Sequence, residues 1–242
     1  IIISRKFKYS VGFDKELVKS LVSTGFVYAL ALFLARLNFK IDILLLSEWS
    51  TMAEVGYYSL GASFAEGWQA PFAVGAVILS TSANKNDANI VNDDLAKLFR
   101  FYLLTTIIVA IGVYFATPYA LPLLYSKDFI PSIPVVQAIL PAVILVIIGK
   151  IFSSRIAGLR KTYLLIYIYV PSLIINVVFN YFLIPTYGAM GAVYATLISY
   201  TFSFIILIIV YSKVTGTSFL VLFAYTKSDF LFLKNIKKYR RK

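Results

Sequence analysis

The chain has 242 residues, of which 60% are hydrophobic and only 14% charged. A soluble domain is about half apolar and about a quarter charged, so this composition excludes the soluble, disordered and fibrous classes. The sequence contains no Cys and no His, which excludes disulfides, thiolate nucleophiles, imidazole bases and the usual zinc ligands. We therefore expect an all-α integral membrane protein without cofactor or metal.

Six apolar stretches are each long enough to cross about 30 Å of hydrocarbon as a helix. Their continuous apolar length favours helices over barrel strands, which would alternate with a period of two. They cover residues 21–46, 55–79, 99–124, 133–152, 163–184 and 188–211. The sequence predicts a cytoplasmic lead-in over residues 1–20 and a six-helix transmembrane bundle over residues 21–212.

Basic residues are distributed unevenly between the two sides of this predicted bundle. Of the 23 Lys and Arg residues, 20 lie on one side. That side consists of the segment before the first predicted helix, the segments after the second, fourth and sixth, and the adjoining helix ends. The opposite loops contain only Lys127. The positive-inside rule then places both ends of the chain in the cytoplasm. The net charge of +12 thus indicates contact with membrane lipids, and we expect no nucleic-acid partner.

Residues 213–242 are predicted to form an interfacial amphipathic segment and a basic cytoplasmic tail. Their apolar part, residues 219–233, is broken by Lys227 and Asp229 and is short for a span,. A seventh span is the alternative. At the other end the chain starts with Ile1 and an apolar triplet, from which we expect a missing N-terminal part. A trimmed but complete six-helix protein is the alternative.

The first predicted helix carries four polar residues deep in its apolar sequence. Arg36 and Lys40 are separated by four residues and share one helix face,. Asn38 and Asp42 share a roughly opposite face. Charges near the bilayer centre are costly and normally face a cavity or a partner. One of these faces is predicted to line a cavity and the other to meet a neighbouring helix.

The second predicted helix contains Glu66, followed by Gln69. Arg36 and Glu66 each lie twelve residues from an acidic residue, Glu48 or Glu54, at the outer end of their helices. At the rise of an α-helix both are roughly 18 Å deep, so antiparallel neighbours can bring them together. A purely structural ion pair is the alternative to a cavity-lining role.

Other polar and small residues are predicted to hold helices together. Asn176 and Asn180 are one turn apart on the fifth predicted helix and favour contacts between helices over ligand binding,. Small-residue pairs at a spacing of four predict close approach of helix backbones; they begin at Gly61, Ser63, Gly188 and Gly191. Prolines inside predicted helices invite kinks; they are Pro71, Pro118, Pro122, Pro141 and Pro171.

Two stretches carry a family resemblance. In the first, Asp42 is followed by a short loop, by VGYYSL at residues 55–60 and by FAE at residues 64–66. In the second, NYFLIPTYG at residues 180–188 continues into GAVYAT at residues 191–196. In this order and spacing, over residues 18–211, the chain resembles the C-terminal half of bacterial polysaccharide biosynthesis flippases, the O-antigen (Wzx-type) transporters. These belong to the multidrug/oligosaccharidyl-lipid/polysaccharide exporter superfamily.

The resemblance implies two six-helix bundles facing each other across a central cavity, with this chain as the second bundle. It implies alternating-access transport of an undecaprenyl-diphosphate-linked oligosaccharide from the inner to the outer leaflet of the bacterial cytoplasmic membrane. The expected partners are this lipid-linked substrate and the missing N-terminal six-helix half. Cationic cavity residues would hold the diphosphate, here Arg36 and Lys40 by position. The full set of predicted substrate-contacting residues is Arg36, Lys40, Glu66, Asp42, Asn38 and Gln69.

Two alternatives remain open. A multidrug or cation antiporter of the same superfamily would favour acids in the cavity, which Asp42 and Glu66 supply. A membrane-embedded polysaccharide-processing enzyme would need a base, often His, and commonly a large outer loop. The sequence has neither, and it lacks the P-loop, GxGxxG and GxSxG motifs,. We expect a transporter rather than an enzyme.

Overall fold

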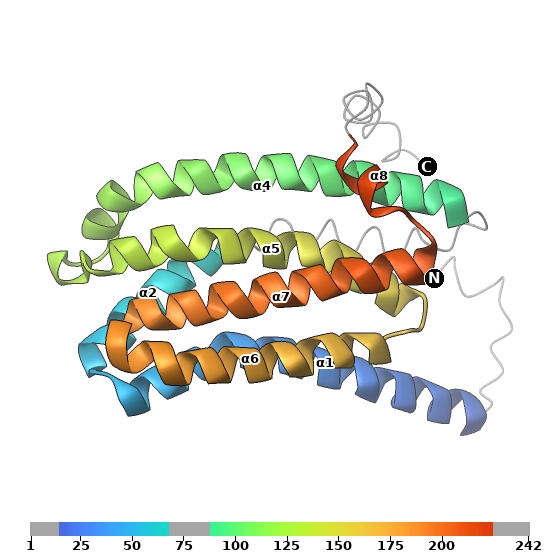
Figure 1. Cartoon of the computed structure of the whole chain (residues 1–242), viewed down its shortest axis with the longest axis horizontal. Coiled ribbons are helices and arrows are strands. Elements are labelled where there is room, and N and C mark those ends of the chain that lie inside the picture. Colours follow the sequence, from blue (N-terminus) through green and yellow to red (C-terminus); the bar gives the residue numbers. More distant parts are fainter. Residues whose placement is uncertain (1–14, 68–87, 225–242) are drawn as a thin grey trace, which may run out of the picture.

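Every regular element that the structure describes is a helix. This computed structural model describes residues 15–67 and 88–224. The elements are α1 (Lys15–Trp49), α2 (Met52–Gly67), α4 (Ala88–Leu124), the short 3-10 helix η2 (Lys127–Phe129), α5 (Ser132–Gly158), α6 (Tyr163–Tyr187), α7 (Ala189–Thr215) and α8 (Phe219–Phe223). Figure 1 shows the long helices lying side by side along the longest axis.

Four of the described helices are long and apolar enough to cross a membrane: Leu95–Leu124, Ser132–Gly158, Tyr163–Tyr187 and Ala189–Thr215. They correspond to the last four predicted spans, so the all-helical membrane class is confirmed. The first predicted span falls inside α1, which has 35 residues. The second is described only as far as Gly67, because residues 68–87 lie outside the described ranges. The count of six spans therefore stays a prediction.

The helices pack in the spatial order α4, α5, α7, α6 and α1, and α2 packs mainly on α5. The connections α1–α2, α4–α5 and α6–α7 lie at one end of the bundle, and α5–α6 lies at the other (Figure 1). This alternation is the one expected for successive membrane crossings.

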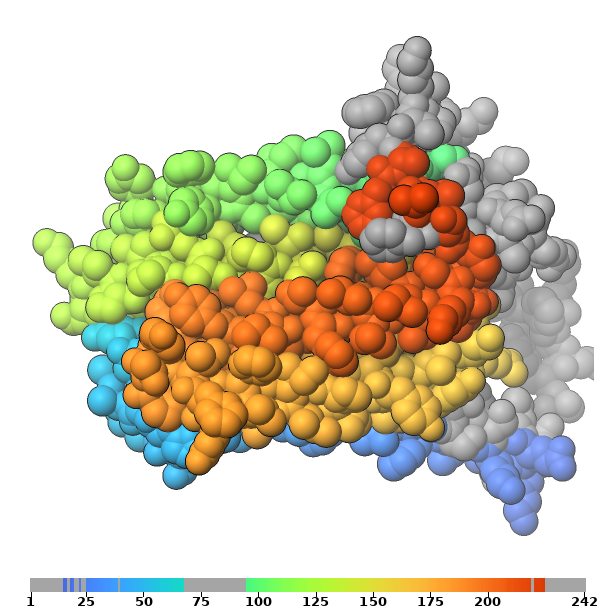
Figure 2. All heavy atoms as spheres, in the orientation of Figure 1, coloured from blue at the N-terminus to red at the C-terminus, as the bar shows by residue number. Residues whose placement is uncertain are grey.

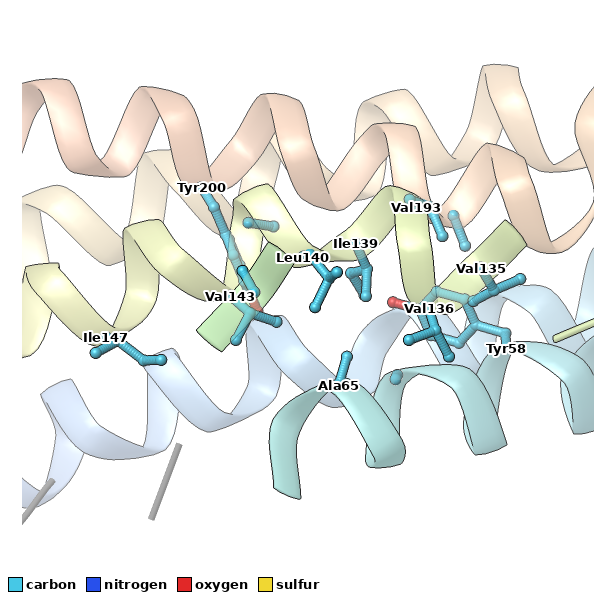
Figure 3. Close-up of a cluster of buried hydrophobic side chains, with 14 of the residues drawn as sticks. Tyr58, Ala65, Val135, Val136, Ile139, Leu140, Val143, Ile147, Val193 and Tyr200 are labelled. Atoms are coloured by element: carbon cyan, nitrogen blue, oxygen red, sulfur yellow. The ribbon is translucent and has the colours of Figure 1, made fainter. Parts of the chain in front are cut away.

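The core lies where α2, α5 and α7 meet. Figure 3 shows Tyr58 of α2 beside Val135 and Val136 of α5, with Val193 of α7 close by. A Cβ atom added to Gly61 would lie 2.6 Å from Val135 Cγ1, and one added to Gly191 would overlap the backbone at Leu183. The close approaches predicted at Gly61 and Gly191 are thus confirmed, because only glycine leaves room at these two positions. The pair of Ser63 and Gly67 shows no such contact, since a Cβ added to Gly67 would meet no atom within 4 Å.

A cross-helix contact fixes the turn between α6 and α7. Gly188 has a φ of 54°, which favours glycine, and it separates the two helices,. The Glu54 carboxylate of α2 accepts a hydrogen bond of 2.7 Å from the Ala189 backbone N–H. A Cβ on Gly188 would lie 2.7 Å from the same carboxylate oxygen. Glycine therefore lets Glu54 reach and cap the start of α7, where a negative charge is favourable.

A side chain of α5 donates the hydrogen bond that a proline removes from α4. Pro118 has no N–H, so it leaves the carbonyl of Tyr114, four residues earlier, without its helical donor,. The Gln137 side chain of α5 donates to this Tyr114 carbonyl oxygen at 3.1 Å. An unsatisfied carbonyl within a membrane is unfavourable, and this contact supplies the donor that Pro118 lacks.

The short helix α8 covers one end of α4 (Figures 1 and 2). Arg100 of α4 is 3% exposed and donates to the Val221 carbonyl oxygen at 2.7 Å. The ring of Phe223 packs edge-on against Phe99, with centroids 5.2 Å apart. The described part of the tail thus docks on the bundle through α8. Residues 225–242, with most of the predicted basic tail, lie outside the described ranges.

Candidate functional site

A pocket of about 210 Å³ opens between α1, α2, α5, α6 and α7. We call it the charged pocket because three ionisable side chains line it: Arg36, Glu66 and Lys150. Leu145, Phe204 and other apolar residues form much of the remaining wall. A charged recess with apolar walls suits a ligand that joins an anionic or cationic group to an apolar one.

The three charges come from three different helices and act on one another. Arg36 on α1 is exposed, whereas Glu66 on α2 and Lys150 on α5 are half-buried. Glu66 interacts electrostatically with Arg36, Lys150 and also Lys40. Arg36 and Lys150 repel each other across the pocket. The carboxylate therefore offsets part of a positive potential that the two cations create together.

Polar groups without charge complete the pocket wall. Asn38 from α1 and Tyr200 from α7 both line it, although each is almost fully buried. Ser153 and Ser203 line it from α5 and α7. Hydroxyl and amide groups at these places can bond to either a donor or an acceptor on a ligand.

A second group of polar residues is sealed between α1, α2, α6 and α7. We call it the buried network; its centre is Asp42, which is 1% exposed. Tyr58 and Thr196 each donate to Asp42 Oδ2 at 2.7 Å, and Asn180 donates to Oδ1 at 2.6 Å. Both carboxylate oxygens are therefore satisfied, which is the condition for a carboxylate to remain stable inside a protein.

The buried network continues along α6 toward the charged pocket. Asn180 also donates to the Asn176 side chain at 3.0 Å, and Asn176 donates to Ser199 at 3.4 Å. Ser172 donates to the Ser199 carbonyl oxygen at 2.9 Å and accepts from Asn38 at 3.1 Å. The prediction that Asn176 and Asn180 join helices is confirmed. Asn38 belongs to both groups, so the network ends at the pocket wall.

The structure separates the six predicted substrate-contacting residues. Arg36 and Glu66 both line the charged pocket, as their matched depth along the helices predicted. Asn38 lines it too, although it was predicted to lie on the face opposite Arg36. Asp42 lies in the buried network, with its oxygens occupied by protein donors. The remaining two are Lys40, which is exposed and outside the described pocket wall, and Gln69, which lies outside the described residues.

Sequence reasoning missed Lys150 and Tyr200 as pocket residues. The fourth span was predicted to end at Phe152, and Lys150 was counted with the loop that follows. In the structure α5 continues to Gly158, so Lys150 lies within the helix and reaches the pocket. The next residue that commonly ends a helix is Gly158, eight residues after Lys150. This spacing could have shown that the helix continues past Lys150. Within residues 15–67 and 88–224, no cluster of His, Cys, Asp or Glu is placed to hold a metal ion.

Comparison with known proteins gives one result. No curated protein and no solved structure matches the chain. A family model described as "Polysaccharide biosynthesis protein" matches residues 1–134, which is more than half of the 242 residues and includes α1, α2, α4 and η2. The matched part also contains Arg36 and Glu66 of the charged pocket. The chain therefore belongs to the polysaccharide biosynthesis protein family.

Proposed function

We propose that this chain is the C-terminal half of an O-antigen-type flippase. It moves an undecaprenyl-diphosphate-linked oligosaccharide from the inner to the outer leaflet of the bacterial cytoplasmic membrane. The observation that carries the proposal is the placement of Arg36 in a pocket between apolar helices. A cation at membrane depth is costly and normally faces a substrate or ion pathway. Membership of a polysaccharide biosynthesis family supports a glycan-bearing cargo.

The chemistry of Arg36 suits a phosphate ligand. Its planar guanidinium can hold two phosphate oxygens at once. The apolar wall at Leu145, Val146 and Phe204 lowers the local dielectric, which strengthens the attraction,. A lipid-linked diphosphate offers an anionic group beside an apolar chain and so matches both parts of the wall.

Glu66 links binding to movement in this proposal. In the empty pocket its carboxylate interacts with Arg36 and Lys150. An incoming diphosphate competes for the same cations, which weakens the tie between α2 and its neighbours and favours a different packing of the helices. We propose that the facing N-terminal bundle completes the cavity and that rocking of the two bundles exposes it to each side in turn.

A cation antiporter of the same superfamily is the second candidate. Glu66 in the pocket wall favours it, because a carboxylate there would bind a cationic drug directly. The two candidates differ in which charge is essential. A flippase needs Arg36, whereas an antiporter needs Glu66 and tolerates the loss of Arg36.

The decisive experiment is Arg36→Ala in the full-length transporter, introduced into a flippase-deficient bacterium. We expect surface polysaccharide to fall about a hundredfold, because two charge-assisted hydrogen bonds to the substrate are lost. Arg36→Lys keeps the charge without the planar fork and is expected to be partly active. Lys161→Ala removes an exposed cation in the α5–α6 turn and serves as the matched control. Normal surface polysaccharide in Arg36→Ala would refute the proposal.

Both chain ends are proposed to lie in the cytoplasm. The sequence has no cysteine, so single-cysteine labelling has no background. Ser50→Cys lies between α1 and α2, and Lys161→Cys lies at the opposite end of the bundle. We expect an impermeant maleimide to label Ser50→Cys in intact cells and Lys161→Cys only after permeabilisation. The reverse pattern would invert the proposed orientation.

A further inference from the structure

Lys150 is the second cation of the charged pocket, and the proposed function does not say what it adds to Arg36. It lies on α5, away from Arg36 in sequence, yet the two side chains line the same cavity. Each is close enough to act on the charge of the other, and the interaction is repulsive. Two like charges from separate helices thus converge on a space of about 210 Å³.

Two cations this close repel each other, and an anionic group between them lowers the energy of the arrangement. In a medium of low dielectric, repulsion between two nearby charges is several times stronger than in water. Glu66 supplies one negative charge, and it interacts with both cations. A ligand with two linked anionic groups would satisfy both cations at once. A ligand with one anionic group would engage Arg36 through its fork and gain less from the second cation.

We propose that Lys150 is a specificity-determining residue, which lets this pocket distinguish a lipid diphosphate from a lipid monophosphate. This inference rests on the proposed flippase function. Arg36 holds one phosphoryl group with two parallel hydrogen bonds, and Lys150, a compact point charge on a flexible stem, holds the other. Each phosphoryl group of a diphosphate thereby meets its own cation, from α1 and α5 respectively.

A purely structural role for Lys150 predicts a different effect of its loss on transport. If Lys150 only balanced Glu66, its loss would lower folded protein and the transport of every substrate by the same factor. If Lys150 binds the second phosphate, its loss lowers the transport of substrates that have one far more than the transport of substrates that do not. The ratio of two transport rates therefore separates the roles, whereas a single rate does not.

The experiment uses the full-length transporter in proteoliposomes with two fluorescent substrates. Both bear the same sugar on the same polyprenyl chain, one through a diphosphate and one through a monophosphate. We expect the wild type to favour the diphosphate by about tenfold or more, the equivalent of one charge-assisted hydrogen bond. Lys150→Met should abolish most of this preference, because it should lower diphosphate transport severalfold more than monophosphate transport. Lys150→Arg should retain the preference, and Lys161→Met should behave as wild type.

Two results would overturn the inference: an unchanged preference in Lys150→Met, or an equal loss of both substrates. Failure of the wild type to move either lipid would instead refute the proposed function. A second measurement needs no variant and covers the case in which Lys150→Met does not fold. Inorganic pyrophosphate should inhibit the wild type at a concentration about tenfold lower than orthophosphate does. Equal inhibition by the two anions would also overturn the inference.

Discussion

The charged pocket and the buried network place polar groups at similar positions on α1 but treat them in opposite ways. Asp42 is 1% exposed and both its oxygens accept hydrogen bonds from other helices. Arg36, less than two turns earlier, is exposed to a cavity and shares it with two other charged side chains. The same helix thus carries one polar residue whose partners lie inside the fold and another that faces a pocket.

This difference predicts which losses harm stability and which harm transport. Removal of a satisfied carboxylate leaves buried donors without partners and weakens the fold. Removal of a pocket charge loses its electrostatic interactions but also its desolvation cost, so we expect the packing of the helices to remain intact. The predictions below test this division in order of expected effect.

Asp42→Ala should cause the largest loss of stability. The change leaves the donors of Tyr58, Thr196 and Asn180 buried without their acceptor. We expect a cost of about 3–5 kcal/mol, as for breaking other buried charged networks. The measurement is the yield and thermal unfolding midpoint of detergent-purified full-length protein.

Asp42→Asn is the informative companion variant, because its amide keeps one acceptor oxygen and should cost less. Glu48→Ala, an exposed position on the same helix, is the matched control and should unfold as wild type does. If Asp42→Ala accumulated and unfolded normally, the buried network would not be a structural feature, and the contrast with the pocket would fail.

Glu66→Gln should alter transport and leave stability nearly unchanged. Without the competing carboxylate charge, the cations bind an anionic substrate more tightly and release it more slowly. We therefore expect both KM and the maximal flipping rate to fall severalfold. Measurement of both parameters in proteoliposomes checks this, with the unfolding midpoint as a control for folding. A loss of folded protein with unchanged kinetics would move Glu66 into the structural class.

Sequence reasoning predicted much of the fold and part of the pocket. Helices follow from apolar length, and the depth of Arg36 and Glu66 follows from the constant rise of a helix, so their shared pocket was predictable. The partners of Asp42 were not, because the rotation of α2, α6 and α7 about their axes is set by packing between helices. Lys150 was missed since a charge near a span end is normally taken to mark the loop.

The smallest predicted effect concerns the hydrogen bond from α5 to α4, which belongs to neither polar group. Gln137→Leu should cost about 1 kcal/mol, because it leaves the Tyr114 carbonyl without a donor,. In a Pro118→Ala background the restored backbone N–H of residue 118 takes over that carbonyl, so the same change should cost almost nothing. A double-mutant cycle on the thermal unfolding of the four proteins isolates this coupling. Equal costs in both backgrounds would show that Gln137 does not supply the donor that Pro118 lacks. If loss of the contact lowers stability and leaves flipping unchanged, the α4–α5 contact has a structural role, as the buried network does.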